Sequence, residues 1–489
     1  MTVRSGGKRL AVLLLLVCCL GCQKSREGAR AAQALGGPCD LDAGPCLPRV
    51  ISVAQPELVS LRGLAIGQDG ATFVAGGLAL PAAASRGSMP ASAGAVDVLV
   101  GRYDASTARP VWLKRLGDPG LQEPSALAVT AEEMVVVAGH FTGTLEADGT
   151  KVTSPDSAGQ SFLLGLSASD GRLRWAQAID LGPGGTLASL AGAHDRVAVC
   201  GSTTRAATGL VPGAAFRGGA KDAVLAMIDG SGKRLWSLEL GGEGNEECLA
   251  VAIDARGDVY AAGRYNRSFT LGAPLPEPGG GQFHHFIWVA KVDGRTGAVL
   301  AQAGFGGPAG AQLPATLAVD GQGQVVLGGL MNAALELGGE AGTLVSAGYT
   351  DGFVAKLDPA SSPPFAARWA ARLGGPGVDG VKSVAVDPAG NVAVAGFFTV
   401  QANGAAVLSG EPPGTDAFLL LLDGATGATR SAQSFGDLDS QTAERVAVGL
   451  GPDGRPFLAL GGEFTGTVSF QGQNPLVSPG GATFLMFAR

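Results

Sequence analysis

The sequence is poor in charged residues, cysteine and histidine, and each shortage excludes a class of protein. Only 16% of its 489 residues are charged, too few for a solvated, disordered chain. Its 7 cysteines are too few for a disulfide scaffold of this length, and its 4 histidines leave few candidates for a metal centre. No glycine repeats at every third position, which excludes a collagen-like chain.

Glycine, in contrast, is abundant. The chain has 79 glycines and 28 prolines, together about 22% of its residues, beside 46% hydrophobic residues. A glycine in a helix interior costs about 1 kcal/mol relative to alanine, whereas tight turns favour it. The composition therefore predicts an all-β protein of short strands joined by turns.

The N-terminus predicts a targeting segment. Arg4, Lys8 and Arg9 precede an apolar run over 10–20, about half the length that a bilayer span needs. The segment resembles a bacterial lipoprotein signal, with Gly21 before a Cys22 that becomes lipidated, although the usual leucine is replaced at Cys19. The resemblance implies a signal peptide over 1–21, anchoring of the exported protein in the cell envelope through the Cys22 lipid, and, from Gln23, the outer membrane. Residues 22–48 are expected to form a flexible tether.

The charge balance limits the partners. Without residues 1–21 the chain keeps 32 basic and 42 acidic side chains, a net charge of about −10. Binding to phosphate backbones needs a basic face, so no nucleic-acid partner is expected. Export to an oxidising compartment predicts a disulfide between Cys39 and Cys46, with two free thiols as the alternative.

One unit recurs seven times along the chain. Apolar runs end in a glycine at intervals of 62 to 67 residues, at Gly76, Gly139, Gly201, Gly263, Gly329, Gly396 and Gly462. A second apolar marker, which begins at 97, 161, 222, 286, 351, 416 and 482, keeps the same period. Two markers in phase over seven copies predict a repeat architecture.

The order within one copy predicts a four-stranded antiparallel blade. A hairpin bent at a glycine is followed by a loop, a third strand and a fourth strand with an aromatic residue near its start. The second strand is apolar at nearly every position, as over 134–138, so both of its faces must be covered. The seventh copy ends after its third strand, and the run 49–54 can supply the fourth. We therefore predict a single seven-bladed β-propeller over 49–489, closed by an N-terminal strand in the last blade; a linear β-solenoid would need capping units.

Two stretches carry a family resemblance. LGGPGVDGVKSVAVDPAGNVAVAG over 373–396 and DGFVAKLD over 351–358 resemble the SBBP-type bacterial β-propeller repeat, best over 222–435. The resemblance implies the fold and no shared reaction. The segments 171–175 and 229–236 are also similar to the blade-docking motif of quinoprotein-like propellers, which include an outer-membrane assembly lipoprotein, but the repeat here is longer.

The sequence carries few of the motifs that mark catalytic or metal-binding sites. The sequence has no phosphate-binding loop, no zinc-protease motif and no nucleophile elbow, so we expect no catalytic residue, metal or cofactor. The adjacent His284 and His285 would point to opposite faces of a strand and could not share one metal. Trp112, Trp175, Trp236 and Trp369 occupy one position of the repeat, which favours a wedge between blades over a sugar platform.

Two further predictions depend on the repeat. Cys200 ends a second strand and Cys248 begins the next first strand, which places both at the same end of neighbouring blades and predicts a disulfide. Loops entering the first strand and leaving the second gather on one face of a propeller, where partners usually bind. On that face the candidate binding residues are polar and mostly acidic, namely Asp118, Glu243, Asn245, Glu246, Asp379 and Asp437. Glu243, Asn245 and Glu246 break the sevenfold pattern, and ordinary solvated loops are the alternative.

These observations favour a lipid-anchored, non-catalytic scaffold or binding protein, expected to be a monomer, that presents one propeller face to a protein or a glycan. The first alternative is an envelope hydrolase or lyase with its site in the central channel, which requires ionisable side chains converging on the axis. The second alternative is an assembly factor for outer-membrane proteins.

Overall fold

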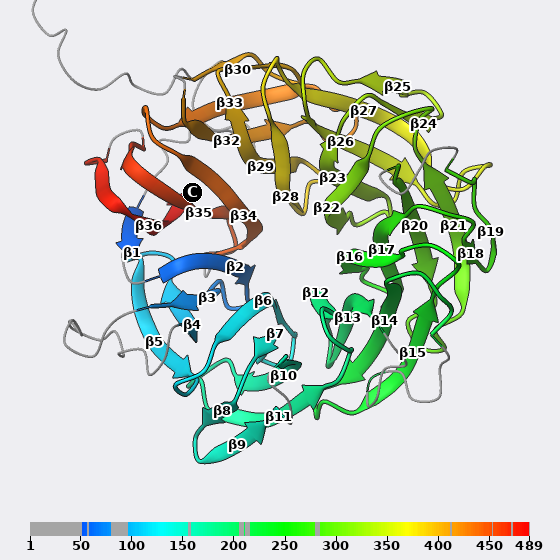
Figure 1. Cartoon of the computed structure of the whole chain (residues 1–489). Helices are drawn as coiled ribbons and strands as arrows, with labels where there is room; N and C mark the ends of the chain where they lie inside the picture. Colours follow the sequence, from blue (N-terminus) through cyan, green and yellow to red (C-terminus); the bar gives the residue numbers. More distant parts are fainter. Residues whose placement is uncertain are drawn as a thin grey trace, which may run out of the picture.

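The computed structural model describes residues 51–55, 58–79, 96–154, 158–204, 210, 216–278, 284–410, 413–451, 453–470 and 473–488. The expected signal peptide, the tether and Cys22, Cys39 and Cys46 lie outside these residues. The described residues form β-strands and turns, arranged as seven four-stranded antiparallel blades around one axis (Figure 1). The predicted all-β, seven-bladed propeller is confirmed. No helix among these residues is long and apolar enough to cross a membrane.

Each blade runs from an innermost strand A through strands B and C to an outermost strand D. Blade 1 contains β2 (Leu58–Ile66), β3 (Thr72–Leu78), β4 (Asp97–Asp104) and β5 (Arg109–Leu116). Blade 2 contains β6 (Gln122–Val129), β7 (Met134–Phe141), β10 (Gln160–Ser167) and β11 (Leu173–Ile179). Blade 3 contains β12 (Thr186–Ala193), β13 (Arg196–Thr203), β14 (Asp222–Asp229) and β15 (Arg234–Leu240). Blade 4 contains β16 (Glu247–Ile253), β17 (Val259–Tyr265), β20 (Phe286–Val292) and β21 (Val299–Phe305).

The remaining blades follow the same order. Blade 5 contains β22 (Gln312–Val319), β23 (Val325–Met331), β26 (Asp351–Asp358) and β27 (Ala366–Gly374). Blade 6 contains β28 (Gly380–Val386), β29 (Val392–Thr399), β32 (Thr415–Leu422) and β33 (Thr429–Phe435). Blade 7 contains β34 (Gln441–Leu450), β35 (Pro456–Val468), β36 (Leu476–Ala488) and, as its strand D, β1 (Ile51–Gln55).

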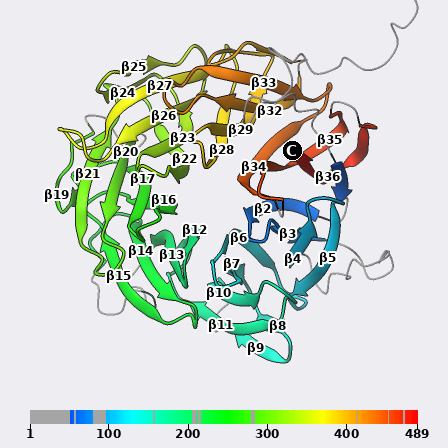
Figure 2. The ribbon, with the colours of Figure 1, turned by 180° about the vertical axis from the view of Figure 1, so that it is seen from behind.

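The two ends of the chain close the ring in one sheet. β1 pairs antiparallel with β36 in a register that sets Ile51 opposite Phe487 and Gln55 opposite Thr483. The view from behind shows the same closure beside the C-terminus (Figure 2). Pairing β1 with β36 covers an edge that would otherwise be free to aggregate.

Small two-stranded hairpins form within the loops between strands B and C, where the sequence predicted loops alone. They are β8 (Thr144–Ala147) with β9 (Thr150–Thr153), β18 (Thr270–Leu271) with β19 (Ala273–Pro274), and β24 (Ala334–Gly338) with β25 (Gly342–Val345). In blade 6, β30 (Gln401–Gly404) and β31 (Leu408–Ser409) instead extend the sheet of blade 5 through a β27–β30 pairing. Strands this short carry little periodicity, which is why the sequence did not reveal them.

The hydrophobic core lies between the blades. Each large cluster of buried side chains combines residues of two neighbouring blades, for example Val224 of blade 3 with Leu163 of blade 2. The four tryptophans predicted as wedges link consecutive blades, since each indole donates a hydrogen bond to a carbonyl of the next blade, as Trp112 Nε1 does to Ala168 O at 3.0 Å. Gly171, at φ +71°, lies against the Trp112 ring, where a Cβ would come within 2.9 Å of it. The wedge prediction is thus confirmed, and it leaves these indoles unavailable as a sugar platform.

Candidate functional site

The six acidic and amide residues predicted to bind a partner lie in loops that lead from strand D of one blade to strand A of the next. The structure does not bring them together. Asp118 lies between blades 1 and 2, Glu243, Asn245 and Glu246 between blades 3 and 4, Asp379 between blades 5 and 6, and Asp437 between blades 6 and 7.

Most of these side chains are engaged within the chain. Asp118 accepts hydrogen bonds from the Gly120 amide at 2.8 Å, from Gln122 Nε2 at 2.8 Å and from the Thr144 amide at 3.0 Å. Asp437 repeats this pattern in the loop between blades 6 and 7. It accepts hydrogen bonds from the backbone amides of residues 439 and 467 and from the side-chain amide of Gln441. These carboxylates hold the loop into strand A against the segment that leaves strand B, so they have a structural use that the sequence did not reveal.

Glu246 and Asp379 are fully buried at one position of the repeat, immediately before strand A begins. Glu246 accepts from the Gly242 amide at 2.8 Å and Asp379 from the Gly375 amide at 2.7 Å. Burial raises the pKa of Glu246 to about 7 and also raises the pKa of Asp379. Three sister blades place a buried glutamine there, namely Gln122, Gln312 and Gln441. Of the six predicted residues only Glu243 is exposed, so a direct role in binding at this loop now depends chiefly on Glu243.

A recurring irregularity marks the inner strands, which lie around the axis (Figure 1). Every strand A carries a β-bulge one residue after the partner of the repeat glycine. Bulges commonly redirect a side chain and are frequent near functional sites. The bulge residues are Arg62, Ser125, Ala188, Leu249, Ala315, Lys382 and Glu444, so the sevenfold backbone carries seven unequal side chains.

Charged side chains form an arc over blades 6, 7, 1 and 2. Lys382 Nζ lies 3.4 Å from Glu444 Oε1, and Arg62 Nη1 lies 3.0 Å from Glu463 Oε1. Arg62 also lies 3.7 Å from Glu123. Arg445 donates through Nε to the Arg62 carbonyl at 3.0 Å, and burial lowers the pKa of its guanidinium. The arc contains three acids and three bases, so its net charge is zero.

A second set of residues distinguishes the blades beside the bulges. In each blade, three residues of strands A, B and C stand opposite one another at the end where the inter-blade loops gather; we call them the mouth row. In blade 2 the mouth row is Glu123, His140 and Ser161. In blade 3 it is Thr186, Ser202 and Ala223, and in blade 5 it is Leu313, Leu330 and Gly352. Blade 2 therefore combines a polar mouth row with a polar bulge residue, Ser125. Blade 7 has the same combination in Thr442, Glu463, Thr483 and Glu444, but Glu463 and Glu444 are ion-paired and the Thr483 hydroxyl donates to the Leu58 carbonyl.

A cavity of about 270 Å³ lies over this part of blade 2. Its lining comes from blade 1 and blade 3 as well, and consists of Arg62, Glu123, Pro124, Ser125, Gly139, His140, Ser161, Thr186 and Leu187. Ser161 is 2% exposed, and its Oγ, like that of Ser125, is buried without a hydrogen-bond partner among the described residues. Buried hydroxyls are nearly always hydrogen-bonded in folded proteins, so two unpartnered ones in one cavity indicate a missing partner.

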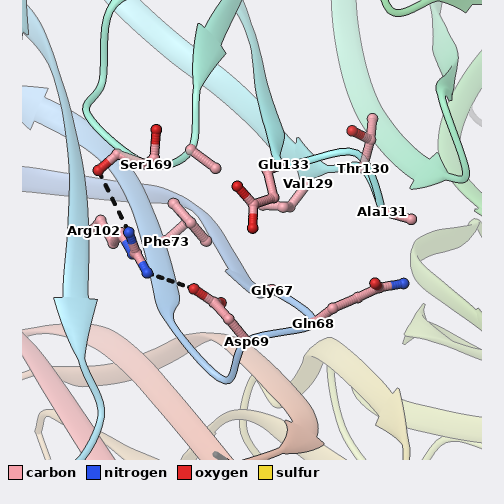
Figure 3. A pocket seen from close by; sticks show the side chains of 11 residues that line it. Gly67, Gln68, Asp69, Phe73, Arg102, Val129, Thr130, Ala131, Glu133 and Ser169 are labelled. Carbon is pink, nitrogen blue, oxygen red and sulfur yellow. Dashed lines mark hydrogen bonds and ion pairs between the residues drawn. The ribbon is translucent and has the colours of Figure 1, made fainter.

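Two other cavities are lined by no unpartnered buried hydroxyl among the described residues. The one in Figure 3 lies at the opposite end of blades 1 and 2 and measures about 20 Å³, the space of a water molecule. Arg102 lines this cavity (Figure 3). Its guanidinium pairs with Asp69, donates to the Ser169 carbonyl and lies over the Phe73 ring. A larger cavity of about 490 Å³ between the turns of blades 3 and 4 is lined by exposed charged residues such as Arg256 and Arg295, and no unpartnered buried polar atom lines it among the described residues.

The polar side chains of the blade 2 cavity do not form a nucleophile–base relay among the described residues. Glu123, His140 and Ser161 stand side by side, but within the described chain no hydrogen bond joins the serine to the histidine or the histidine to the glutamate. A nucleophile needs such a relay to a base. Over the same residues no group of three or more histidine, cysteine, aspartate or glutamate side chains is arranged to hold a metal ion. His284 is buried, with Nε2 3.0 Å from the Gly307 carbonyl, which agrees with a structural histidine.

The structure joins Cys200 of blade 3 to Cys248 of blade 4 by a disulfide, as predicted, with their Cα atoms 5.4 Å apart. Both side chains are buried between the two blades. The predicted Cys39–Cys46 pair and the Cys22 lipidation site lie outside the described residues and stay predictions.

Sequence reasoning missed the cavity. The signal was present, because the residue after each repeat glycine changes from copy to copy, through Gly77, His140, Ser202, Arg264, Leu330, Phe397 and Glu463. What the sequence could not show is that residues on three strands of blade 2 meet Arg62 of one neighbour and Thr186 of the other.

Comparisons with known proteins add no family. No family model and no curated protein matches this chain. Among solved structures, the quinohemoprotein alcohol dehydrogenase of Comamonas testosteroni is 12% identical with a TM-score of 0.41, covering 93% of this chain and 78% of that one. The Neurospora crassa Pan2 WD40 domain is 12% identical with a TM-score of 0.39, covering 75% and 88%. A protein of unknown function from Dyadobacter fermentans is 9% identical with a TM-score of 0.41, covering 91% and 98%. Likenesses of this size carry no argument about function, and the SBBP-type resemblance stays a prediction.

Proposed function

We propose that this chain is a lipid-anchored, non-catalytic binding protein of the cell envelope, and that its ligand or partner occupies the cavity over blade 2. The observation that carries the proposal is the pair of buried hydroxyls of Ser125 and Ser161, which line a cavity of about 270 Å³ and find no partner in the part of the chain that the structure describes. The anchoring rests on the sequence signal at Gly21 and Cys22.

The rigidity of the ring supports a binding role. Side chains such as Asp118 and Asp437 fix the loops around the mouth, and the disulfide joins blades 3 and 4. A preformed site loses little conformational entropy when it binds, which favours affinity. The site also departs from the sevenfold pattern, as a site for a single ligand must.

The channel hydrolase is the weaker candidate. Ionisable side chains do line the inner strands, which that hypothesis requires. Arg62, Lys382 and their glutamates are, however, ion-paired with one another, and among the described residues the Ser161 hydroxyl has no hydrogen bond to His140. An outer-membrane assembly role differs from our proposal only in the identity of the partner.

Site-directed photocrosslinking in intact cells tests the proposal. A photoreactive residue at the exposed Thr186, on the cavity rim, is expected to capture a partner, whereas one at the exposed His194, on the opposite end of the same strand, is expected to capture none. Equal capture from both positions, or capture from position 194 alone, would contradict the assignment of the site.

A further inference from the structure

Blade 2 and blade 3 differ at all four positions of the mouth row and the bulge, where Glu123 corresponds to Thr186 and three further side chains also change. Blade 2 has Ser125, His140 and Ser161 where blade 3 has Ala188, Ser202 and Ala223. Two of the three changes place a hydroxyl where blade 3 has only a methyl group. The ring folds with alanine at these positions in other blades, so the serines are not required by the blade architecture.

The two hydroxyls lack partners within the described residues. Ser161 Oγ and Ser125 Oγ are both buried, and each could donate one hydrogen bond and accept others. Leaving such a group buried and unpaired costs free energy, which a ligand that pairs with it recovers. The ligand must therefore offer donors and acceptors at short spacing.

The charged groups of the cavity are already neutralised. Arg62 is ion-paired with Glu463 at 3.0 Å and lies 3.7 Å from Glu123, and the arc to which they belong has no net charge. A charged ligand would have to break one of these pairs or leave its own charge unpaired in a partly buried site. The electrostatics therefore favour a ligand without net charge.

Size and shape narrow the class further. About 270 Å³ is slightly below the range of roughly 300 to 1,000 Å³ that accommodates drug-sized ligands, so one ring fits better than an oligomer. Pro124 and Leu187 supply an apolar part of the lining against which C–H groups can pack.

We infer that the cavity over blade 2 binds an uncharged, hydroxyl-rich ring such as one neutral sugar residue, with Ser125 and Ser161 paired to its hydroxyls. The inference rests on the proposed function and names the ligand class for the same site. His140, on the strand between those of Ser125 and Ser161, and Thr186 of blade 3 also line the cavity and supply further polar contacts.

Ligand-observed NMR and calorimetry on the full chain test the inference. The probes are the methyl glycosides of glucose, galactose and N-acetylglucosamine, with glucuronate and glucosamine as charged counterparts of similar size. We expect a neutral glycoside to bind more tightly than its charged counterparts, and the double variant Ser125→Ala and Ser161→Ala to weaken binding about tenfold or more through the loss of two hydrogen bonds.

Thr483→Ala is the matched control. Thr483 is buried at the strand C position of the blade 7 mouth row, and its hydroxyl donates to the Leu58 carbonyl at 3.0 Å. This variant is expected to lower stability and leave sugar affinity unchanged. The double serine variant should keep or raise thermal stability, because it removes two unpaired buried hydroxyls at positions where sister blades carry alanine.

The results separate the inference from the proposed function. Tighter binding of a charged sugar, no binding of any neutral sugar, or unchanged affinity in the double serine variant would overturn the inference. If position 186 still captures a partner in cells, the proposed function stands with a different ligand class. If position 186 captures nothing and no sugar binds, both fail.

Discussion

Replacing Glu246 by glutamine should stabilise the folded protein at neutral and alkaline pH. The side chain is fully buried, one oxygen accepts from the Gly242 amide, and the other has no hydrogen-bond partner in the described chain. Burial raises the pKa of the carboxyl group to about 7 from an ordinary 4.5. Glutamine is the natural residue at this position in blades 2, 5 and 7, where Gln441 Nε2, for example, donates to the Thr465 carbonyl at 2.8 Å.

The magnitude and sign follow from proton linkage. The folded state binds this proton more tightly than the unfolded state, so its stabilising effect is complete below pH 4.5 and is lost as the pH rises towards 7. The difference between 4.5 and about 7 corresponds to about 3 kcal/mol in the free energy of unfolding. Glu246→Gln removes the carboxylate, so we expect the variant to exceed the natural protein by up to about 3 kcal/mol at pH 8 and to match it near pH 4.5.

Urea unfolding monitored by tryptophan fluorescence between pH 4.5 and 8.5 measures this difference. Gln441→Glu is the converse control, because it places an acid at the same position of blade 7. It should destabilise the protein at pH 8 and have a smaller effect at low pH. The reasoning is refuted if Glu246→Gln is no more stable than the natural protein at pH 8, or if its advantage does not diminish as the pH falls.

Three further predictions concern the ring itself. In blades 1 and 5 a buried strand C aspartate pairs with a strand D arginine, as Asp351 does with Arg372 at 2.8 Å. In blade 3 the side chain of Glu239 instead meets that of Asp222, and burial raises the pKa of both carboxyl groups. Glu239→Arg should therefore raise the melting temperature at pH 8, and Arg372→Glu should lower it; the reverse order would exclude an unfavourable carboxyl pair in blade 3. Peptide mapping without reduction should recover Cys200 linked to Cys248. Reduction should lower the free energy of unfolding by about 4 kcal/mol, given the 48-residue separation. Recovery of both cysteines as alkylated thiols without reduction would refute the bond. Val53→Pro should lower the melting temperature and promote aggregation, because it removes an amide from the β1–β36 pairing and frees an edge; an unchanged melting temperature would argue against closure by β1.

The fold could be predicted from the sequence because the repeat constrains it. Continuous apolarity in the second strand, a glycine every 62 to 67 residues and the complementary ends together leave one architecture, and β1 lies where the run 49–54 was expected. The disulfide followed from the same register. Each of these depends on local pattern or on the order of strands, which a sequence records.

The candidate site could not be predicted in the same way. Acidic loop residues such as Asp118 looked available for a partner, but Asp118 and Asp437 each also accept from a backbone amide 26 or 30 residues further along the chain, which a sequence does not reveal. Conversely, Ser125 and Ser161 have no motif around them. The proposal for them depends on buried hydroxyls without a partner among the described residues, which follows from how three blades pack and from a bulge that no propensity predicts.

Replacing Ser125, His140 and Ser161 by the corresponding residues of blade 3 tests the central claim most directly. The triple variant Ser125→Ala, His140→Ser and Ser161→Ala gives blade 2 the residues that blade 3 carries at these positions. With the photoreactive residue at position 186, we predict an unchanged melting temperature and the loss of partner capture in intact cells. Capture that persists at full yield in a folded triple variant would contradict the claim that the departure of blade 2 from its sister blades creates the binding site.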